Sequence, residues 1–431
     1  MSRTPCAGPL ENARRRLEAL GLWGQRQQMG RRWPVGCVAL EITQRCNLDC
    51  TACYLSEASE ALHDLPLEEV FRRIAAIGAR YGAGTDIQIT GGEPTLRRAG
   101  ELAAIVRRAR QAGLRPTLFT NGIRANHILL EKLAAEGLEG VAFHVDTTQQ
   151  RKGHDSEASL NALREEYIAR VRGLPLAVYF NTTVHGANAH EIAALARFFV
   201  GHAGRVQLAS FQLQAATGRG VLGARPGGVS MASTAAAIRA GAQTPLEFDA
   251  MDIGHPGCNR YAAALVVNGV AYDALDDARL VAEVLAKTAR IPLDRARPAH
   301  AAARLVAALA AHPRTLARCL AWTARKAWAM RRNLFAARGR VSKISFFIHD
   351  FMDACNLDPE RVEACSFVVQ AADGPVSMCA HNARRDEHLL SALRVNGGYW
   401  DPVSGRNHGA PVVHRVVLTR RNARGRARQA L

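Results

Sequence analysis

The chain has 431 residues, of which 48% are apolar, and a formal net charge of +18. This apolar fraction is enough for a complete hydrophobic core, which excludes a chain that is disordered throughout. No apolar run reaches the roughly 18 residues of a transmembrane helix. The polar, charged first residues lack the apolar stretch of a signal peptide, so a cytoplasmic location is expected.

The first 34 residues predict a short helix, residues 12–20, and then a basic connector. From Val35 onward, short strand-like runs alternate with amphipathic helical segments. Six such β-then-α units predict a parallel sheet, either doubly wound or curled into a barrel. The six runs are residues 35–43, 85–91, 114–122, 138–146, 174–184 and 204–213.

Chemically active residues follow the ends of these predicted strands. Cys46 follows the first, Gly91 the second, Asn121 the third and Asp146 the fourth. In barrels and open α/β sheets, ligands bind at the edge formed by the carboxyl ends of the strands. A ligand site is therefore predicted at this edge.

The stretch EITQRCNLDCTACYL carries Cys46, Cys50 and Cys53 within eight residues. Thiolates are the ligands that iron–sulfur clusters require. Three of them around one corner of a 4Fe–4S cluster would leave one iron open to a small molecule. A partial zinc site, or three cysteines brought together by chance, is the competing interpretation.

The spacing Cys-x3-Cys-x2-Cys after the first strand, TGGEP after the second and FTNG after the third resemble the radical S-adenosylmethionine (SAM) superfamily. The resemblance covers residues 35–215. It implies a partial (β/α)6 TIM-like barrel in which Cys46, Cys50 and Cys53 hold a 4Fe–4S cluster. It also implies reductive cleavage of SAM to a 5′-deoxyadenosyl radical that abstracts hydrogen from an unactivated carbon, with an electron donor such as flavodoxin or ferredoxin.

The resemblance also implies which residues bind SAM. Gly91 and Gly92 would let the backbone approach its methionine end. Glu93 would pair with its ammonium group or hold the turn, and Asn121 would contact the ribose or form a turn. Many members have an aromatic residue before the third cysteine, whereas this chain has Ala52 there and Tyr54 after it. The remaining candidates for the pocket are Tyr54, Pro94, His144, Asp146, Thr183 and Asn188.

Four further cysteines lie in turn-rich settings and could close an auxiliary 4Fe–4S cluster or a zinc site. The region 349–382 resembles a block in a radical SAM group that includes archaeal tetraether lipid synthase and proteins labelled pterin methyltransferases. In that block Cys365 and Cys379 have counterparts and Cys355 has none. The four candidate ligands are Cys258, Cys355, Cys365 and Cys379.

The chain is expected to divide into a radical SAM core (35–225), a helical segment (226–342), an auxiliary-cluster module (343–414) and a disordered basic tail (415–431). Residues 295–349 contain twelve Lys or Arg and no Asp or Glu. Within this stretch, residues 312–335 have a helical pattern that suits a membrane interface or a helix packed on the barrel. The predicted apolar face is Leu316, Leu320, Thr323, Ala327, Met330 and Leu334, with Arg318, Arg325 and Arg332 opposite and Trp322 and Trp328 on the flanks.

These features favour a radical SAM enzyme acting on a lipid-like substrate by C–C coupling, alkylation or methylation, with peripheral contact at the inner face of the membrane. The alternatives are a pterin-type methyltransferase, a peptide-modifying maturase, and a nucleic-acid-binding protein with a structural metal. No RNA-binding motif accompanies the positive charge, so no nucleic-acid partner is expected.

Overall fold

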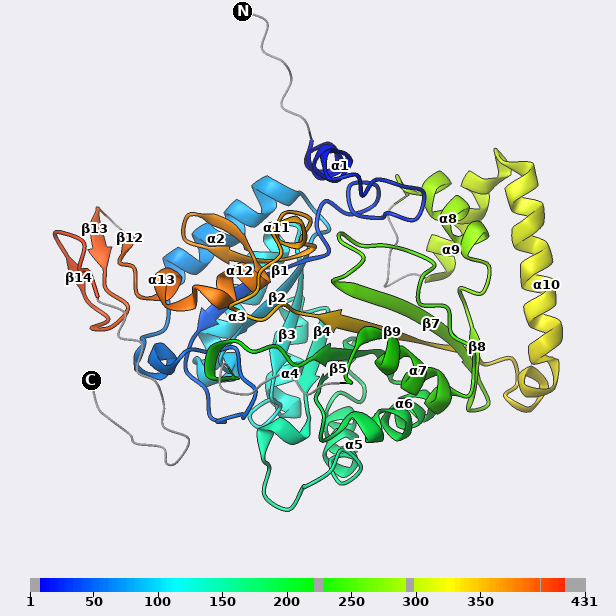
Figure 1. The fold of residues 1–431 in the computed structure, drawn as a ribbon, viewed down its shortest axis with the longest axis horizontal. Helices are drawn as coiled ribbons and strands as arrows, with labels where there is room; N and C mark the ends of the chain where they lie inside the picture. Colours follow the sequence, from blue (N-terminus) through cyan, green and yellow to red (C-terminus); the bar gives the residue numbers. More distant parts are fainter. Residues whose placement is uncertain (1–7, 221–227, 292–297, 396, 415–431) are drawn as a thin grey trace, which may run out of the picture.

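The computed structural model describes residues 8–220, 228–291, 298–395 and 397–414, and the predicted basic tail, 415–431, lies outside these ranges. Six strands run side by side in parallel (Figure 1). They coincide with the six predicted runs and confirm the α/β fold, consistent with a partial TIM-like barrel. The strands are β1 (Cys37–Thr43), β2 (Asp86–Gly91), β3 (Arg115–Thr120), β4 (Gly140–His144), β5 (Ala177–Val184) and β6 (Val206–Leu213).

The crossover helices between these strands cover the sheet. All but the first residue of β1 are buried, as expected for a parallel strand that is covered on both faces. The segment 67–81 has its apolar residues at helical spacing and buries Val70, Ile74 and Ile77. The helices are α2 (Leu67–Tyr81), α3 (Ala99–Gln111), α4 (His127–Ala135), α5 (Asn161–Arg170) and α6 (Ile192–Gly201).

Strands from the second half of the chain extend the sheet at both edges. One set pairs outward from β6 and the other from β1, giving the order β11-β10-β1-β2-β3-β4-β5-β6-β9-β7-β8. The pairs β6–β9 and β1–β10 are parallel. The added strands are β7 (Asn259–Val267), β8 (Val270–Asp273), β9 (Ser342–Asp350), β10 (Phe367–Ala371) and β11 (Gly374–Ser377).

The segment 226–342, predicted to be helical, therefore contains the hairpin β7–β8. Its run of Ala262, Ala263 and Ala264 has high helix propensity, but this stretch pairs antiparallel with β9 along its length. Tertiary pairing outweighs local preference here. The remaining elements are α1 (Pro9–Ala19), α7 (Met231–Ala242), α11 (Pro359–Glu363), α12 (Met378–Ala383), α13 (Arg385–Leu389), β12 (Leu393–Val395), β13 (Gly398–Trp400) and β14 (Asn407–His408).

The helices α8 (Ala278–Lys287), α9 (Pro298–Ala310) and α10 (Pro313–Ala336) form one end of the molecule (Figure 1). The apolar face predicted for α10 is wrong, because Met330 is buried against the protein while Leu320 is exposed. Trp322, predicted at a flank, donates from Nε1 to Asp276 at 2.7 Å. Helical periodicity alone does not show which of two apolar stripes packs. No helix within the described residues is long and apolar enough to span a bilayer.

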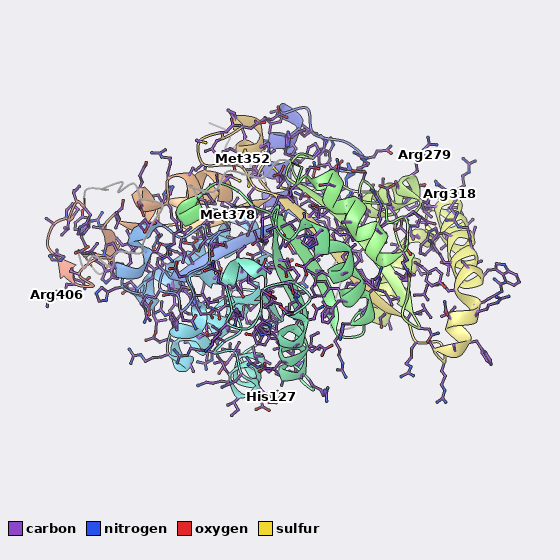
Figure 2. The ribbon with its side chains drawn as sticks, turned by 60° about the horizontal axis from the view of Figure 1, so that its bottom comes forward. His127, Arg279, Arg318, Met352, Met378 and Arg406 are labelled. Atoms are coloured by element: carbon purple, nitrogen blue, oxygen red, sulfur yellow. The ribbon has the colours of Figure 1, made fainter. Side chains whose placement is uncertain are left out.

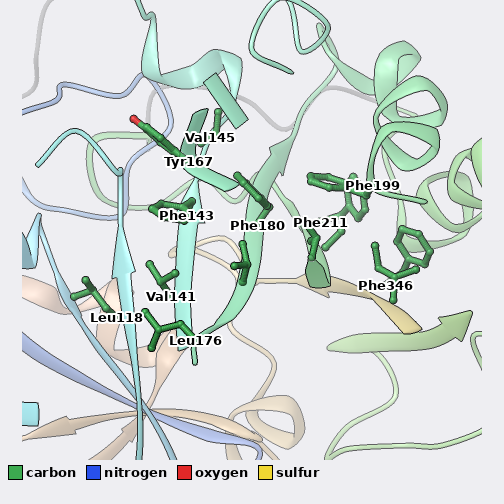
Figure 3. Close-up of a cluster of buried hydrophobic side chains, with 14 of the residues drawn as sticks. Leu118, Val141, Phe143, Val145, Tyr167, Leu176, Phe180, Phe199, Phe211 and Phe346 are labelled. Carbon is green, nitrogen blue, oxygen red and sulfur yellow. The ribbon is translucent and has the colours of Figure 1, made fainter. Parts of the chain in front are cut away.

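A continuous apolar core lies between the sheet and its helices. Its centre is a chain of aromatic rings in which Phe143 contacts Tyr167 and Phe180, with centroids 4.9 and 5.7 Å apart (Figure 3). Phe180 in turn lies 5.5 Å from Phe199, which contacts Phe211 edge-on. Such ring pairs contribute beyond the burial of their area, so this core fixes β4, β5 and β6 relative to one another.

Candidate active site

The three-cysteine loop follows β1 and borders a cavity of about 200 Å³. Cys46, Cys50 and Cys53 all line this cavity as free, half-buried thiols. Burial raises the pKa of all three thiols, to about 11 for Cys46. Repulsion from neighbouring thiolates contributes to the raised pKa of Cys46 and of Cys50. The loop therefore brings the three sulfurs to one cavity and keeps them protonated in the absence of a cation.

Within the described residues, no three Cys, His, Asp or Glu side chains are arranged to hold a metal ion as they stand. The donor set nevertheless fits an iron–sulfur cluster, because three free thiols on one short loop supply its soft ligands and leave one iron without a protein ligand. A bound cation would displace the thiol protons. The residues present are therefore compatible with the cluster.

The glycine turn after β2 lies directly against the cysteine loop. The amide of Gly92 donates to the carbonyl of Thr43 at 2.9 Å, and the amide of Glu93 to that of Arg45 at 2.8 Å. A Cβ atom on Gly91 or Gly92 would lie 2.0 or 2.2 Å from the same two carbonyl oxygens. Glycine is thus required here for backbone packing against the loop, and both glycines also line the cavity.

Glu93 and Asn121 join the strand ends to one another. The Glu93 carboxylate is 1% exposed and accepts from the hydroxyls of Thr95 and Thr120 and from the amide of Asn121. It does not line the cavity, and neither does Pro94. Asn121 does line it, and its amide group donates to Asn47 on the cysteine loop at 2.7 Å. Of the two roles predicted for Glu93, these hydrogen bonds correspond to holding the turn.

At the ends of β4 and β5, His144 faces the cavity and Asp146 lies behind it. The Asp146 carboxylate is fully buried, 2.7 Å from Nε2 of His144 and 2.7 Å from the amide of Thr183. Burial alone would raise the pKa of Asp146, but the charge and hydrogen bond of His144 lower it. Burial alone would lower the pKa of His144, and Asp146 raises it. His144 and Thr183 line the cavity, whereas Asp146 positions them.

A buried ion pair between Glu41 and Arg385, which the sequence analysis did not predict, packs against the ring of Tyr54. Glu41, on β1, lies 2.7 Å from Arg385, which stacks over the Tyr54 ring with its guanidinium 4.8 Å from the centroid. Burial alone would raise the pKa of Glu41, but the charge of Arg385 lowers it to about 2. The Tyr54 hydroxyl donates to the carbonyl of Gly91 at 2.6 Å. Glu41 could have been noticed in the sequence as an acidic residue inside the apolar run of β1. Its partner Arg385, however, lies 344 positions further along the chain.

Part of the cavity wall comes from the C-terminal half of the chain. Phe351, Phe367 and Met378 are its apolar members, and Asn382 adds an amide. Phe351 stacks on His349 at 5.5 Å between centroids, and burial lowers the pKa of His349 to about 3, so this imidazole is neutral. No sequence spacing marked these residues as neighbours of the cysteine loop. Other lining residues are Leu48, Leu55, Gln88, Thr90, Phe119, Gln149, Asn181, Gln212, Leu213, Gln214, Ala215 and Thr217.

Three of the four predicted auxiliary ligands lie near one another. Burial, together with the nearby Cys365 and Cys258, raises the pKa of Cys379 to about 12. Cys258 accepts a hydrogen bond from Arg361 Nε at 3.4 Å. Cys355 is exposed, and no contact places it with the other three. Cys258, Cys365 and Cys379 thus lie near enough to influence one another's pKa, whereas no described contact links Cys355 to them.

A protein-family model described as the Radical SAM superfamily matches residues 40–199. This region begins in β1, contains the cysteine loop and the glycine turn, and extends into α6. The chain therefore contains a radical SAM domain, and the members of this superfamily are enzymes that use SAM and a 4Fe–4S cluster.

The chain is similar to PqqA peptide cyclase of Xanthomonas euvesicatoria pv. vesicatoria, with 32% identity over 162 residues, 37% of this chain and 42% of that protein. It is also similar to 7,8-dihydro-6-hydroxymethylpterin dimethyltransferase of Methanocaldococcus jannaschii, with 27% identity over 186 residues, 42% of this chain and 36% of that protein. The chain thus covers about two fifths of the length of these relatives. The solved structure of native anSMEcpe with bound AdoMet and Kp18Cys peptide aligns with a TM-score of 0.37 and 15% identity, over 47% of this chain and 57% of that one.

Proposed function

We propose that this protein is a radical SAM enzyme that acts on a carbon–hydrogen bond in an apolar, uncharged part of its substrate. The observation that carries the proposal is one cavity lined by the cysteine loop, the glycine turn and the apolar side chains of Phe351, Phe367 and Met378. Apart from the cysteines and Tyr54, the ionisable lining residues are Glu41 and His144, each paired with a buried partner. An apolar substrate group fits this cavity, because the cavity wall presents no unpaired charge.

When bound, SAM and its cluster supply the 5′-deoxyadenosyl radical that removes a hydrogen atom from an unactivated carbon. Cys46, Cys50 and Cys53 would hold the cluster, and Tyr54 fixes the Gly91 carbonyl at the cavity edge. His144, held by Asp146, presents a polar imidazole to the cavity and can donate a hydrogen bond to a bound ligand. The apolar wall excludes water from the carbon that reacts.

Cys258, Cys365 and Cys379 would hold an auxiliary cluster. The proximity of three thiols, two of them buried, supports this role, and soft thiolate ligands suit iron–sulfur chemistry. The nearby Arg361 guanidinium would offset part of the negative charge of such a site. A flavodoxin or ferredoxin would supply the electrons.

The proposed substrate is lipid-like, and the outcome is C–C coupling, alkylation or methylation. A protein with such a substrate would contact the inner face of the membrane peripherally. The two curated relatives are named for a peptide and a pterin, so peptide modification and pterin methylation are the alternatives. A pterin is polar and would need hydrogen-bond partners, which the glutamine- and asparagine-bearing part of the cavity offers.

The test is to purify the protein without oxygen, reconstitute it with iron and sulfide, and assay 5′-deoxyadenosine after reduction with SAM. Wild type should form it, whereas a variant with Cys46, Cys50 and Cys53 changed to Ala should form none and should lose about four irons, the content of one 4Fe–4S cluster. The matched control is Cys319→Ala, a half-buried cysteine on α10.

Extracted membrane lipids, a pterin and a peptide library would then be compared as substrates, with transfer of hydrogen from deuterated substrate into 5′-deoxyadenosine as the readout. Wild type that forms no 5′-deoxyadenosine would overturn the enzyme class. Label transfer from the pterin or a peptide, and none from lipid, would overturn the lipid-like substrate.

A further inference from the structure

Helix α10 is packed on the protein along one side. Trp322 and Lys326 both reach Asp276, at 2.7 and 2.9 Å, and Asn333 donates to the hydroxyl of Tyr272 at 2.7 Å. Met330 is buried on the same side. These residues recur every three or four positions, so one face of the helix is fully occupied by contacts with the β7–β8 hairpin and the start of α8.

The opposite side of α10 carries large apolar residues with no cover. Leu320, Trp328 and Phe335 are 62%, 70% and 90% exposed. They are spaced by about two helical turns each, so they lie along one stripe. Figures 1 and 2 show α10 at one end of the molecule, and the stripe lies on the side of the helix opposite the residues that contact Asp276 and Tyr272. An exposed apolar stripe of this kind marks an interaction surface.

Arginines accompany the stripe, and we call Leu320, Trp328, Phe335, Arg331 and Arg332 the outer face of α10. The guanidinium of Arg331 lies 4.2 Å from the centroid of the Trp328 ring. Within the described part of the chain, no carboxylate forms an ion pair with Arg331 or Arg332.

The acidic residues near the helix lie on its packed side. Asp276, Asp277 and Glu283 pair there with Arg318, Arg325 and Lys326. The outer face therefore combines exposed apolar side chains with positive charge that no described carboxylate pairs, whereas the arginines and lysine on the packed side pair with carboxylates of α8 and of the segment before it.

We propose that the outer face of α10 docks the protein onto an anionic phospholipid bilayer. Such a surface offers phosphates for the arginines and an apolar layer for Leu320, Trp328 and Phe335, and tryptophan favours the boundary between them. A polyanion such as RNA would satisfy the arginines but would leave Leu320 and Phe335 in water. The docking does not depend on the chemistry at the cysteine loop, so each can fail without the other.

The test is flotation of the full-length protein with vesicles of phosphatidylcholine alone or with about 30% phosphatidylglycerol, at physiological ionic strength. Wild type should float with the anionic vesicles and not with the neutral ones. Changing Leu320, Trp328 and Phe335 together to Ser should lower the floated fraction by at least about tenfold, because interfacial binding scales with the apolar area buried. Changing Arg331 and Arg332 to Gln tests the charge component separately.

The matched control is Ile128→Ser, because Ile128 on α4 is 75% exposed and distant from α10 in the sequence. This variant should float as wild type does. All variants should keep the circular dichroism spectrum and the melting temperature of wild type, which shows that they are folded independently of any activity. Wild type that stays unbound, serine variants that float normally, or equal binding to neutral vesicles would overturn the proposal. RNA binding that depends on the outer face, together with an absence of flotation, would also overturn the proposal. It would indicate a nucleic acid as the partner of this face.

Discussion

The two cysteine groups are assembled in different ways. Cys46, Cys50 and Cys53 lie on a single loop after β1, so their proximity is a property of the local sequence. Cys365 and Cys379 flank the β10–β11 hairpin, whereas Cys258 precedes β7, about a hundred positions earlier in the chain, and only the folded sheet brings it near them. A local group can be inferred from spacing, whereas a long-range group exists only in the folded chain.

The largest expected effect concerns the composition of the second group. Changing Cys258, Cys365 and Cys379 together to Ala should remove about four irons per chain after anaerobic reconstitution, while leaving those of the first loop. Cys355→Ala should remove none, because Cys355 is exposed and apart from the others. Iron and acid-labile sulfide measure both. Loss of iron in Cys355→Ala would show that Cys355 is a ligand of the second group after all.

The second prediction concerns the link from the C-terminal segment to the first group. Arg385→Met should lower the free energy of unfolding by about 3–5 kcal/mol, because it leaves the buried Glu41 carboxylate unpaired. Denaturant unfolding at neutral pH measures this loss. Arg384→Met is the matched control, since that neighbouring side chain is exposed and pairs with Glu387 at the surface.

The pH dependence of this loss has a definite sign. The pKa of Glu41 is about 2 in the folded protein, below its ordinary value of 4.5, so the pair stabilises the fold above pH 4.5. That stabilisation is lost as the pH falls toward 2. The difference between wild type and Arg385→Met should therefore shrink over this range. A difference that stays constant would mean that Arg385 acts through packing and not through Glu41.

The smallest expected effect concerns the glycine turn. Tyr54→Phe keeps the ring under Arg385 but removes the hydroxyl that donates to Gly91. Loss of one such hydrogen bond, worth about 1 kcal/mol, should raise the KM for SAM roughly fivefold with little change in stability. Tyr399→Phe, in the small sheet, should leave it unchanged. An unchanged KM in Tyr54→Phe would separate this contact from SAM binding.

The six parallel strands and the positions that follow them could be predicted, because β/α alternation and apolar periodicity are local signals. The same holds for Cys46, Cys50, Cys53, Gly91 and Gly92, which all reach the predicted edge. The structure adds a second reason for the glycines, because the backbone of the cysteine loop packs directly against them. Sequence spacing does not reveal what packs against a turn.

Long-range features could not be predicted for the same reason. Arg385 has no local feature that marks it as the partner of Glu41, and Phe351 and Phe367 read as ordinary apolar residues until β9 and β10 are placed at opposite edges of the six-strand sheet. The stripe on α10 shows a further limit. The helical periodicity of α10 was visible in the sequence, but the predicted apolar face was a different one, because which side packs depends on Asp276 and Tyr272, which lie elsewhere in the chain.

The positions of β9 and β10 also bear on how the chain is made. On a ribosome, β1 and β6 emerge long before residues 342–371, so the backbone groups along both outer strands stay unpaired while translation continues. Open strand edges invite pairing with other nascent chains. Production of this protein in a host cell should therefore benefit from chaperones and slow synthesis, and a stop before residue 342 should yield insoluble material even though the cysteine loop is complete.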